Sequence, residues 1–293
     1  MTEDESGPTL VRTIAELRAE LEGDRRAGRT VGFVPTMGYL HEGHLSLVDR
    51  ARREADVVVV SIFVNPAQFG PDEDYDAYPR DLDRDLEAAA DRGVDVVFAP
   101  EVAEMYPRPQ TVWVEPGPFA DRLCGASRPG HFRGVLTVVL KLFHAVEPDL
   151  AVFGRKDFQQ LVLVRRMTEE LNLPIRILGG PVVREPDGLA MSSRNAYLSD
   201  QERRRSLSLS RGLRRARRSF GEGERNPERL EEIAREPLEE ADARIDYVEV
   251  VDPSTLERPE EARAESVCAV AAHVGDTRLI DNARLGGASS LEG

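Results

Sequence analysis

The chain has 293 residues, of which 41% are hydrophobic, so it is long enough for two ordinary domains with substantial cores. Its 39 basic and 53 acidic residues give a net charge of −14, and such a surface repels nucleic acid and anionic membranes unless basic groups are concentrated locally. Two cysteines are too few for a disulfide framework or a zinc cluster, and the longest apolar run is far shorter than the ~20 residues of a membrane span, so we expect a soluble cytoplasmic protein.

The first half of the chain alternates short β-branched runs with stretches whose apolar residues recur at helical spacing. Strands are predicted at Thr30–Pro35, Val57–Val64, Val94–Ala99, Leu150–Gly154 and Pro174–Leu178. Helices are predicted around Leu45–Ala55, Leu82–Ala89, Val135–Val146 and Phe158–Leu171, with an irregular segment from Pro100 to Pro129. By propensity Val135–Val146 could also be a strand, but its length favours a buried helix. This alternation predicts an α/β fold with a doubly wound parallel sheet, in which ligands bind beyond the carboxyl ends of the strands.

The pattern of expected helices and strands changes after Asn195. Ser199-Asp-Gln-Glu202 has the pattern of a capping box, which predicts that a helix begins there. A second helix is expected at Leu230–Ala243, and strands are expected at Tyr247–Val251, Val267–Val274 and Arg278–Asp281. We therefore expect a smaller C-terminal α+β domain, with residues 1–183 forming the first domain and 184–293 the second.

The segment with the most chemical character runs from Pro35 to His44 and reads PTMGYLHEGH. A strand ends there, a glycine permits a tight turn, and His41 and His44 lie three residues apart at the start of a helix. The N-terminus of a helix favours an anion such as a phosphate. The spacing is one residue short of the His-Glu-x-x-His zinc motif, so a metal site is not favoured. The alternative to an anion site is that both histidines only form hydrogen bonds within an ordinary turn.

Four other segments carry polar groups at expected strand or helix ends. FVNPAQFG (63–70) places the amides of Asn65 and Gln68 after a buried strand, although Asn-Pro is also an ordinary turn signal. RPGHFRGV (128–135) resembles an anion clamp, but a surface loop of an arginine-rich protein is slightly favoured by composition alone. GRKDFQQ (154–160) contains Lys156, one of only two lysines among 39 basic residues. This rarity argues against a chance occurrence of lysine in the segment. MSSRNAYL (191–198) places hydroxyl groups beside an arginine, which can bind phosphate oxygens at a domain junction. The alternative is that this segment is a polar linker.

Other nucleotide-binding motifs and nucleic-acid binding lose support. Neither a Walker A sequence nor G-x-G-x-x-G occurs. Residues 203–218 include eight arginines, but these fall on the outer faces of an expected amphipathic helix in an acidic protein, so we do not expect a nucleic-acid partner.

Together the five segments resemble the pantothenate synthetase (pantoate–β-alanine ligase) family, in which the same motifs occur in this order and spacing, here over about Val31–Leu198. The resemblance implies a Rossmann-like, nucleotidyltransferase-like first domain, a C-terminal lid domain and usually a homodimer. It also implies the conversion of pantoate, β-alanine and ATP to pantothenate, AMP and pyrophosphate with Mg²⁺, through a pantoyl adenylate.

The resemblance also assigns residues. His44 is implied as the proton donor, with His41 and Lys156 as its catalytic companions. Gln68 and Gln160 are implied as pantoate contacts, and Gln68 also as a β-alanine contact. ATP contacts are implied at Met37, Gly38, Tyr39, Leu40, His41, Glu42, Gly43, His44, Gly154, Arg155, Lys156, Asp157, Val183, Met191, Ser192, Ser193 and Arg194.

The chain departs from the family pattern at a few positions. Arg155 stands where an acidic residue is common, and we expect it to be peripheral. Arg84 and Ala88 occupy part of a stretch in which some members place acidic or amide groups near the metal, so Asp85 is only a possible metal contact.

Two other functions remain open from the sequence. An adenylyltransferase of the same superfamily would share the histidine loop but stop after transferring AMP to its acceptor, whereas the paired glutamines favour the ligase. A nucleotide-binding regulator without turnover would be expected to lack a charged motif residue, and His44, Lys156 and Arg194 are all present.

Overall fold

The computed structural model describes residues 7–71 and 73–287, which form two compact units. The first unit contains the residues up to Pro116 together with Gly130–Gly154 and Leu163–Gly180. The second contains Gly117–Pro129, Arg155–Val162 and the residues from Pro181 onward. The chain thus passes between the units more than once, and the last passage lies between Gly180 and Pro181.

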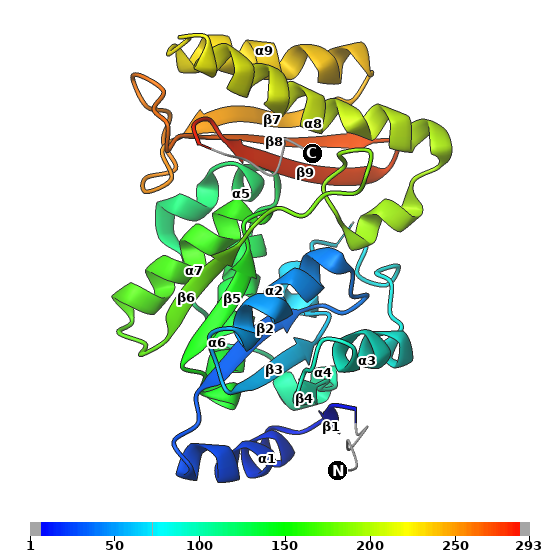
Figure 1. Cartoon of the computed structure of the whole chain (residues 1–293), viewed down its shortest axis with the longest axis vertical. Coiled ribbons are helices and arrows are strands. Elements are labelled where there is room, and N and C mark those ends of the chain that lie inside the picture. Colours follow the sequence, from blue (N-terminus) through cyan, green and yellow to red (C-terminus); the bar gives the residue numbers. More distant parts are fainter. Residues whose placement is uncertain (1–6, 72, 288–293) are drawn as a thin grey trace. The chain divides into compact units, whose positions relative to one another are not determined.

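The first unit is built on a six-stranded sheet in the order β1-β4-β3-β2-β5-β6, with every neighbouring pair parallel (Figure 1). Its strands are β1 (Thr9–Val11), β2 (Val31–Thr36), β3 (Val57–Ile62), β4 (Val96–Phe98), β5 (Leu150–Gly154) and β6 (Arg176–Gly180). The order reverses between β2 and β5, which is the switch point where doubly wound sheets bind ligands. The doubly wound parallel sheet predicted from the sequence is confirmed.

Neighbouring residues of β2 pack on opposite faces of this sheet, as strand geometry requires. Phe33 makes an edge contact with Phe143 of α6 (His131–Val146), with ring centroids 6.4 Å apart. Val34 lies in the cluster formed by Leu45 and Val48 of α2 (Glu42–Arg52). Because both faces are covered, the central strands carry continuous apolar runs instead of alternating ones.

The remaining helical segments of this unit are α1 (Ile14–Arg26), the 3₁₀ turn η1 (Pro66–Gln68), α3 (Leu82–Ala90), α4 (Val102–Met105) and most of α7 (Phe158–Glu170). The buried helix expected over Val135–Val146 is confirmed as α6, which begins four residues earlier at His131. The expected helix at residues 82–89 is confirmed as α3. The helix expected at residues 45–55 is present as α2, but it begins at Glu42 and ends at Arg52, so Ala55 lies outside it.

Sequence analysis missed β1 and α1. β1 has only three residues, and α1 buries only Leu17 and Leu21, so neither gives a strong apolar pattern. A local signal for α1 did exist, since Thr13 and Glu16 form a capping box in which each side chain bonds the other's backbone N–H.

The second unit is a three-stranded antiparallel sheet in the order β7-β8-β9, with two long helices packed on it (Figure 1). The elements are η2 (Gly117–Asp121), α5 (Cys124–Ser127), the first turn of α7, η3 (Ser193–Tyr197), α8 (Asp200–Gly221), α9 (Pro227–Glu240), β7 (Arg244–Val251), β8 (Val267–Val274) and β9 (Thr277–Arg284). The capping box predicted at Ser199 is present, and the smaller α+β unit is confirmed.

Two chain segments that precede Pro181 belong to this unit because they complete its core. Leu123 and Val162 pack with Val251, Val267 and Ala269 in one buried cluster. Gln159 fixes the first of these segments, since its Nε2 donates to the carbonyl oxygens of Phe119 (2.9 Å) and Arg122 (2.8 Å).

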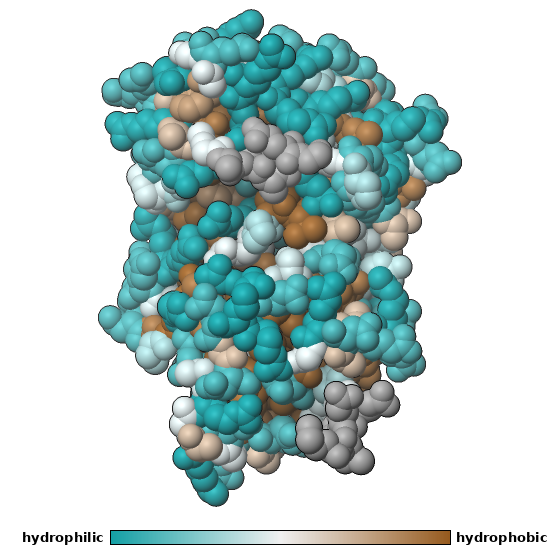
Figure 2. All heavy atoms as spheres, in the orientation of Figure 1, coloured by the Kyte–Doolittle hydropathy of each residue, from teal (hydrophilic) through white to brown (hydrophobic). Residues whose placement is uncertain are grey.

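Several of the eight arginines of α8 pair with acidic groups of their own unit. Arg203 bonds Glu185 and Asp187, Arg215 lies within 4 Å of Glu236 and Glu240, and Arg218 bonds Glu222. The face of the molecule drawn in Figure 2 is correspondingly hydrophilic over α8 and α9. Among the helices of the described residues, none combines the length and the apolar character needed to cross a bilayer.

Candidate functional site

The loop between β2 and α2 brings the two motif histidines together, as their spacing predicted. His41 is the N-cap of α2, and its Nδ1 accepts the backbone N–H of Gly43 at 3.1 Å. The rings of His41 and His44 stack, with centroids 4.0 Å apart and an angle of 27° between their planes. Because the cap bond uses the Nδ1 lone pair, the neutral His41 ring carries its proton on Nε2. The first turn of α2 thus combines backbone N–H groups with two imidazoles.

Asp85 in α3 holds this loop in shape. Its carboxylate accepts the backbone N–H groups of Tyr39 (2.7 Å) and Leu40 (2.6 Å), and the residue is only 1% exposed. Burial raises the pKa of Asp85, and the two backbone hydrogen bonds act in the opposite direction. Gly38 adopts a φ of +83°, and a Cβ there would lie 2.9 Å from the Asp85 carboxylate and 2.8 Å from Ile62. The loop therefore needs glycine at this position.

Arg84, one of the departures from the family pattern, supports the same loop. Arg84 donates to the carbonyl oxygen of Leu40 at 3.1 Å, and its guanidinium lies 4.5 Å from the centre of the Tyr39 ring. Ala88 packs against the apolar core of the first unit. Both oxygens of Asp85 are engaged with backbone N–H groups, and the described residues contain no group of three His, Cys, Asp or Glu side chains that could hold a metal ion. This geometry supports Asp85 as an anchor of the loop, a different role from the metal contact considered above.

Gln68 lies in the 3₁₀ turn η1 after β3, and its side chain is oriented by neighbours on both sides. Its Nε2 donates to the sulfur of Met37 at 3.1 Å, and its Oε1 accepts from Asn65 Nδ2 at 3.1 Å. The first two motifs therefore meet at this amide.

Asn65 connects the same cluster to two further segments. Its Nδ2 also donates to the carbonyl oxygen of Gly134 (3.2 Å), and its Oδ1 accepts the hydroxyl of Tyr106 (2.7 Å). Burial raises the pKa of Tyr106 to about 12, so the phenol stays protonated and remains a donor at neutral pH. Sequence analysis gave Tyr106 no role, because it lies in a segment without periodicity and its partner is distant in sequence.

The third motif packs directly on the second. His131 begins α6 and its Nδ1 lies 2.8 Å from the carbonyl oxygen of Gln68, which can only accept, so the ring donates from Nδ1. Gly134 lies one turn later, and a Cβ there would be 2.1 Å from the carbonyl oxygen of Ala67. The first unit thus assembles three motifs, from Met37–His44, Asn65–Gln68 and His131–Gly134.

We expect Gly134→Ala to lower the midpoint of thermal unfolding, because η1 must move away from the added methyl group. Overpacking of this kind costs about 1–3 kcal/mol, more than the roughly 0.5–1 kcal/mol that alanine gains over glycine inside a helix. Gly23→Ala in α1 is the matched control, since nothing lies within 4 Å of its Cβ, and it should raise the midpoint slightly. Equal shifts for the two variants would contradict this reading of Gly134.

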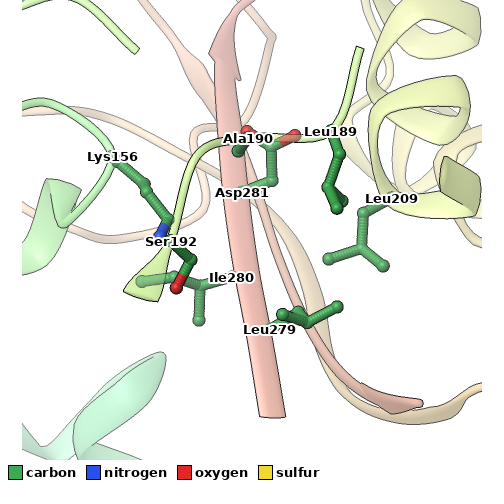
Figure 3. Close-up of a pocket in the computed structure, with 8 residues that line it drawn as sticks. All are labelled: Lys156, Leu189, Ala190, Ser192, Leu209, Leu279, Ile280 and Asp281. Atoms are coloured by element: carbon green, nitrogen blue, oxygen red, sulfur yellow. The ribbon is translucent and has the colours of Figure 1, made fainter. Parts of the chain in front are cut away.

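The fourth motif lies in the second unit from Arg155 onward. Lys156 is half-buried and lines a cavity of about 10 Å³ (room for about one water molecule) together with Leu189, Ala190, Ser192, Leu209, Leu279, Ile280 and Asp281 (Figure 3). Burial lowers the pKa of Lys156, the nearby Arg194 lowers it further, and Asp157 and Asp281 oppose the shift. Arg155, by contrast, is exposed, in line with the peripheral place expected for it.

The fifth motif is joined to Val183 by backbone pairing. Met191 N–H donates to the carbonyl oxygen of Val183 at 3.0 Å, next to an antiparallel bridge between Arg184 and Ala190. Ser192 then caps η3, with its hydroxyl accepting the backbone N–H of Arg194 at 3.3 Å. The second unit therefore places Val183 beside Met191–Arg194, although these residues are separated in the sequence.

The two predicted pantoate contacts lie in different units. Gln68 belongs to the histidine cluster of the first unit, whereas Gln160 lies in the first turn of α7 and belongs to the second. Each unit thus has its own cluster of cationic or hydrogen-bonding groups: imidazoles and a helix N-terminus in the first, Lys156 and Arg194 in the second.

Residues 9–284 match the model of the family described as pantoate-beta-alanine ligase. A protein named pantothenate synthetase 1 from Bradyrhizobium diazoefficiens is 56% identical over 274 residues, which cover 93% of this chain and 96% of that relative. Pantothenate synthetase from Thermotoga petrophila is 54% identical over 278 residues, covering 94% and 99%.

Two solved structures are similar in fold as well as sequence. The crystal structure of pantothenate synthetase from Thermus thermophilus has a TM-score of 0.90 and 48% identity, covering 95% of this chain and 100% of that one. The pantoate-beta-alanine ligase from Francisella tularensis, complexed with beta-gamma ATP and beta-alanine, has a TM-score of 0.80 and 34% identity, covering 95% and 98%.

Proposed function

The chain belongs to the pantoate-beta-alanine ligase family, and we infer that it joins pantoate to β-alanine in an ATP-dependent condensation that yields pantothenate, AMP and pyrophosphate. The observation that carries this inference is the family match over residues 9–284, which spans both units and includes all five motifs. ATP is therefore a substrate, and the protein is a ligase.

The reaction needs activation because a carboxylate and an amine do not condense in water unaided. In the step we propose, a carboxylate oxygen of pantoate attacks the α-phosphorus of ATP, pyrophosphate leaves, and pantoyl adenylate forms. The amine of β-alanine then attacks the acyl carbon, AMP leaves with the carboxylate oxygen, and the nitrogen loses a proton as the amide forms. Both reactants of the first step are anions, so positive potential must offset their repulsion.

We propose that residues of both units supply this potential. In the first unit, the N-terminus of α2 with His41 and His44 faces the phosphates, and His44 donates a proton or hydrogen bond to the charge that develops on them. In the second unit, Lys156 and Arg194 contact the phosphates. The full set of proposed ATP contacts is Met37–His44, Gly154–Asp157, Val183 and Met191–Arg194.

We further propose that Gln68 and Gln160 bind pantoate and that Gln68 also contacts β-alanine. The hydrogen bonds of Gln68 support this role, because Asn65 fixes its Oε1 while its Nε2 points to a thioether sulfur. Sulfur of this kind is a weak acceptor, so a hydroxyl or carboxylate oxygen of a substrate can replace it favourably.

Both oxygens of Asp85 accept backbone N–H groups of residues 39 and 40, and the described residues include no group of three His, Cys, Asp or Glu side chains that could hold a metal ion. Mg²⁺ typically binds through phosphates and waters with few carboxylates, so we propose that it enters with ATP, held by the phosphate oxygens. We also propose that the protein is cytoplasmic and that it forms a homodimer. Sedimentation of the purified chain at several concentrations tests the homodimer.

An adenylyltransferase of the same superfamily is the alternative function. It would release pyrophosphate and retain AMP on the acceptor, whereas the ligase releases free AMP only when an amine is present.

The decisive experiment incubates the protein with ATP, Mg²⁺ and pantoate, then adds β-alanine and follows AMP and pantothenate by mass spectrometry. We expect equal amounts of both products, with pantothenate formed only when all substrates are present. ATP consumption without amide formation, or transfer of AMP to another acceptor, would refute the ligase.

The lowered pKa of Lys156 predicts a pH dependence of activity. The cationic form binds phosphate, and it is lost as pH rises through the lowered pKa, so kcat/KM for ATP should fall at a pH below the range of an ordinary lysine. Bound phosphates favour the cation, so the basic limb of kcat should lie at higher pH than that of kcat/KM.

The measurement is pantoate-dependent exchange of labelled pyrophosphate into ATP, which avoids the titrating amine of β-alanine. If the reduced exchange rate of Lys156→Ala still falls over the same basic pH range, a group other than Lys156 causes that fall.

A further inference from the structure

Asn282, in the middle of β9, is bonded to the loop that carries Lys156. Its single Nδ2 group donates to the carbonyl oxygens of both Arg155 and Lys156, each at 2.9 Å. Asn282 is 8% exposed, and β9 pairs with β8 through its backbone at this position, opposite Ala269. The strand therefore forms without this side chain, whose amide is directed to the loop.

The preceding residue, Asp281, holds the other proposed ATP-binding segment of the second unit. Its carboxylate accepts two hydrogen bonds from Arg184, at 2.7 and 2.9 Å, in an ion pair that is almost completely buried. Arg184 follows Val183 directly and bridges to Ala190. Asp281 also accepts the backbone N–H of Asn282 at 2.8 Å, which fixes the Asp281 carboxylate to the strand backbone next to Asn282.

These contacts attach the backbone of Arg155 and Lys156 to β9. Asp281 and Lys156 line the same small cavity, so the strand that holds the lysine's backbone also forms the wall beside its side chain (Figure 3). Rotation of the Arg155–Lys156 backbone would break the bonds from Asn282 and move the Cα from which the lysine side chain extends.

We propose that Asn282 is a positioning residue for Lys156: its amide clamps two consecutive carbonyl groups and thereby fixes where the ammonium meets the phosphates of ATP. The inference rests on the proposed function for its catalytic consequence, since it assumes that Lys156 acts on ATP. Its structural part, the placement of the lysine side chain, stands independently.

Chemical labelling tests the placement without reference to activity. The chain contains only two lysines, Lys141 and Lys156, so an amine-selective acylating reagent followed by peptide mass spectrometry reads Lys156 directly, with Lys141 of α6 as an internal standard. In Asn282→Ala and in Asn282→Leu, which removes the donor but keeps a similar volume, we expect the Lys156-to-Lys141 labelling ratio at fixed pH to change severalfold. Asn226→Ala, which removes the N-cap of α9 in the same unit, should leave the ratio unchanged.

A double-mutant cycle tests the catalytic part. Asn282→Ala alone should reduce pantoate-dependent ATP–pyrophosphate exchange by about tenfold or more, because small misplacements of a reacting group are costly. In a Lys156→Ala background the same change should cost less than about twofold, since residues that act through one another are not additive.

The proposal is overturned if the labelling ratio of both Asn282 variants equals that of the parent protein, or if the two substitutions reduce exchange independently. Circular dichroism and the thermal midpoint identify any variant that does not fold, and Asn282→Leu then replaces Asn282→Ala in the cycle. Absence of exchange in the parent protein would refute the proposed function instead, and the labelling result would still decide the placement of Lys156.

Discussion

Lys156→Ala is expected to reduce pantoate-dependent exchange of pyrophosphate into ATP by a factor of about 10²–10³, the usual loss for one preorganised donor to a developing negative charge. Lys156 is half-buried and lines a small cavity, and the carbonyl groups of its loop bond to Asn282. A compact cation in such a place cannot be replaced by solvent without rearrangement. The initial rate of exchange at saturating ATP and pantoate is the measurement.

Lys141→Ala is the matched control, because Lys141 is the only other lysine of the chain and lies in α6 of the first unit. Its ammonium lies 4.9 Å from the centre of the Tyr106 ring, and Lys141 is not among the proposed ATP, pantoate or β-alanine contacts. Lys141→Ala should keep exchange within about threefold of the parent, well below the loss of a catalytic donor. Similar rates for the two lysine variants would remove Lys156 from the mechanism.

His44→Ala should cause a loss of comparable size, about 10²-fold in the same exchange assay. His44 lies in the first turn of α2, stacked on His41, where backbone N–H groups and the helix dipole favour a phosphate. The substitution leaves the N-cap of the helix intact, because the capping side chain is that of His41. His41→Ala, by contrast, would add a stability loss of about 0.5–2 kcal/mol from the missing cap and is less informative.

The control for His44 is His144→Ala, which removes an exposed imidazole near the C-terminus of α6. Its exchange rate and thermal midpoint should match those of the parent protein. Exchange by His44→Ala at more than about a third of the parent rate would be inconsistent with a donor that acts in the transition state.

Much of the fold could be predicted because its signals are local. The continuous apolar run at Val57–Val60 identifies a strand covered on both faces, and all four residues are buried. The Ser199 capping box identified the start of α8 to the residue. α1 was missed although Thr13 and Glu16 carry the same signature, because its apolar face is narrow. The segments 117–129 and 155–162 belong to the second unit because of core contacts that no local pattern reports.

The motif loops of the candidate site could be predicted for the same reason, but their supporting contacts could not. Asp85, Tyr106 and Asn282 each bond to a motif loop that is distant in sequence, and Asn282 is separated from Lys156 by 126 residues. Partners of this kind are determined by which elements the tertiary fold brings together. A polar residue at the end of a strand can be recognised from the sequence as a hydrogen-bonding group. The sequence does not identify the distant group to which it bonds.

The central claim is that the carboxylate of pantoate attacks the α-phosphorus of ATP. Pantoate labelled with oxygen-18 in its carboxyl group tests this claim most directly, when the AMP formed in a complete reaction with β-alanine is analysed by mass spectrometry. The account predicts that one labelled oxygen appears in the phosphate of AMP, because that oxygen bridges carbon and phosphorus in the adenylate. AMP without label, or label in inorganic phosphate or pyrophosphate, would contradict it.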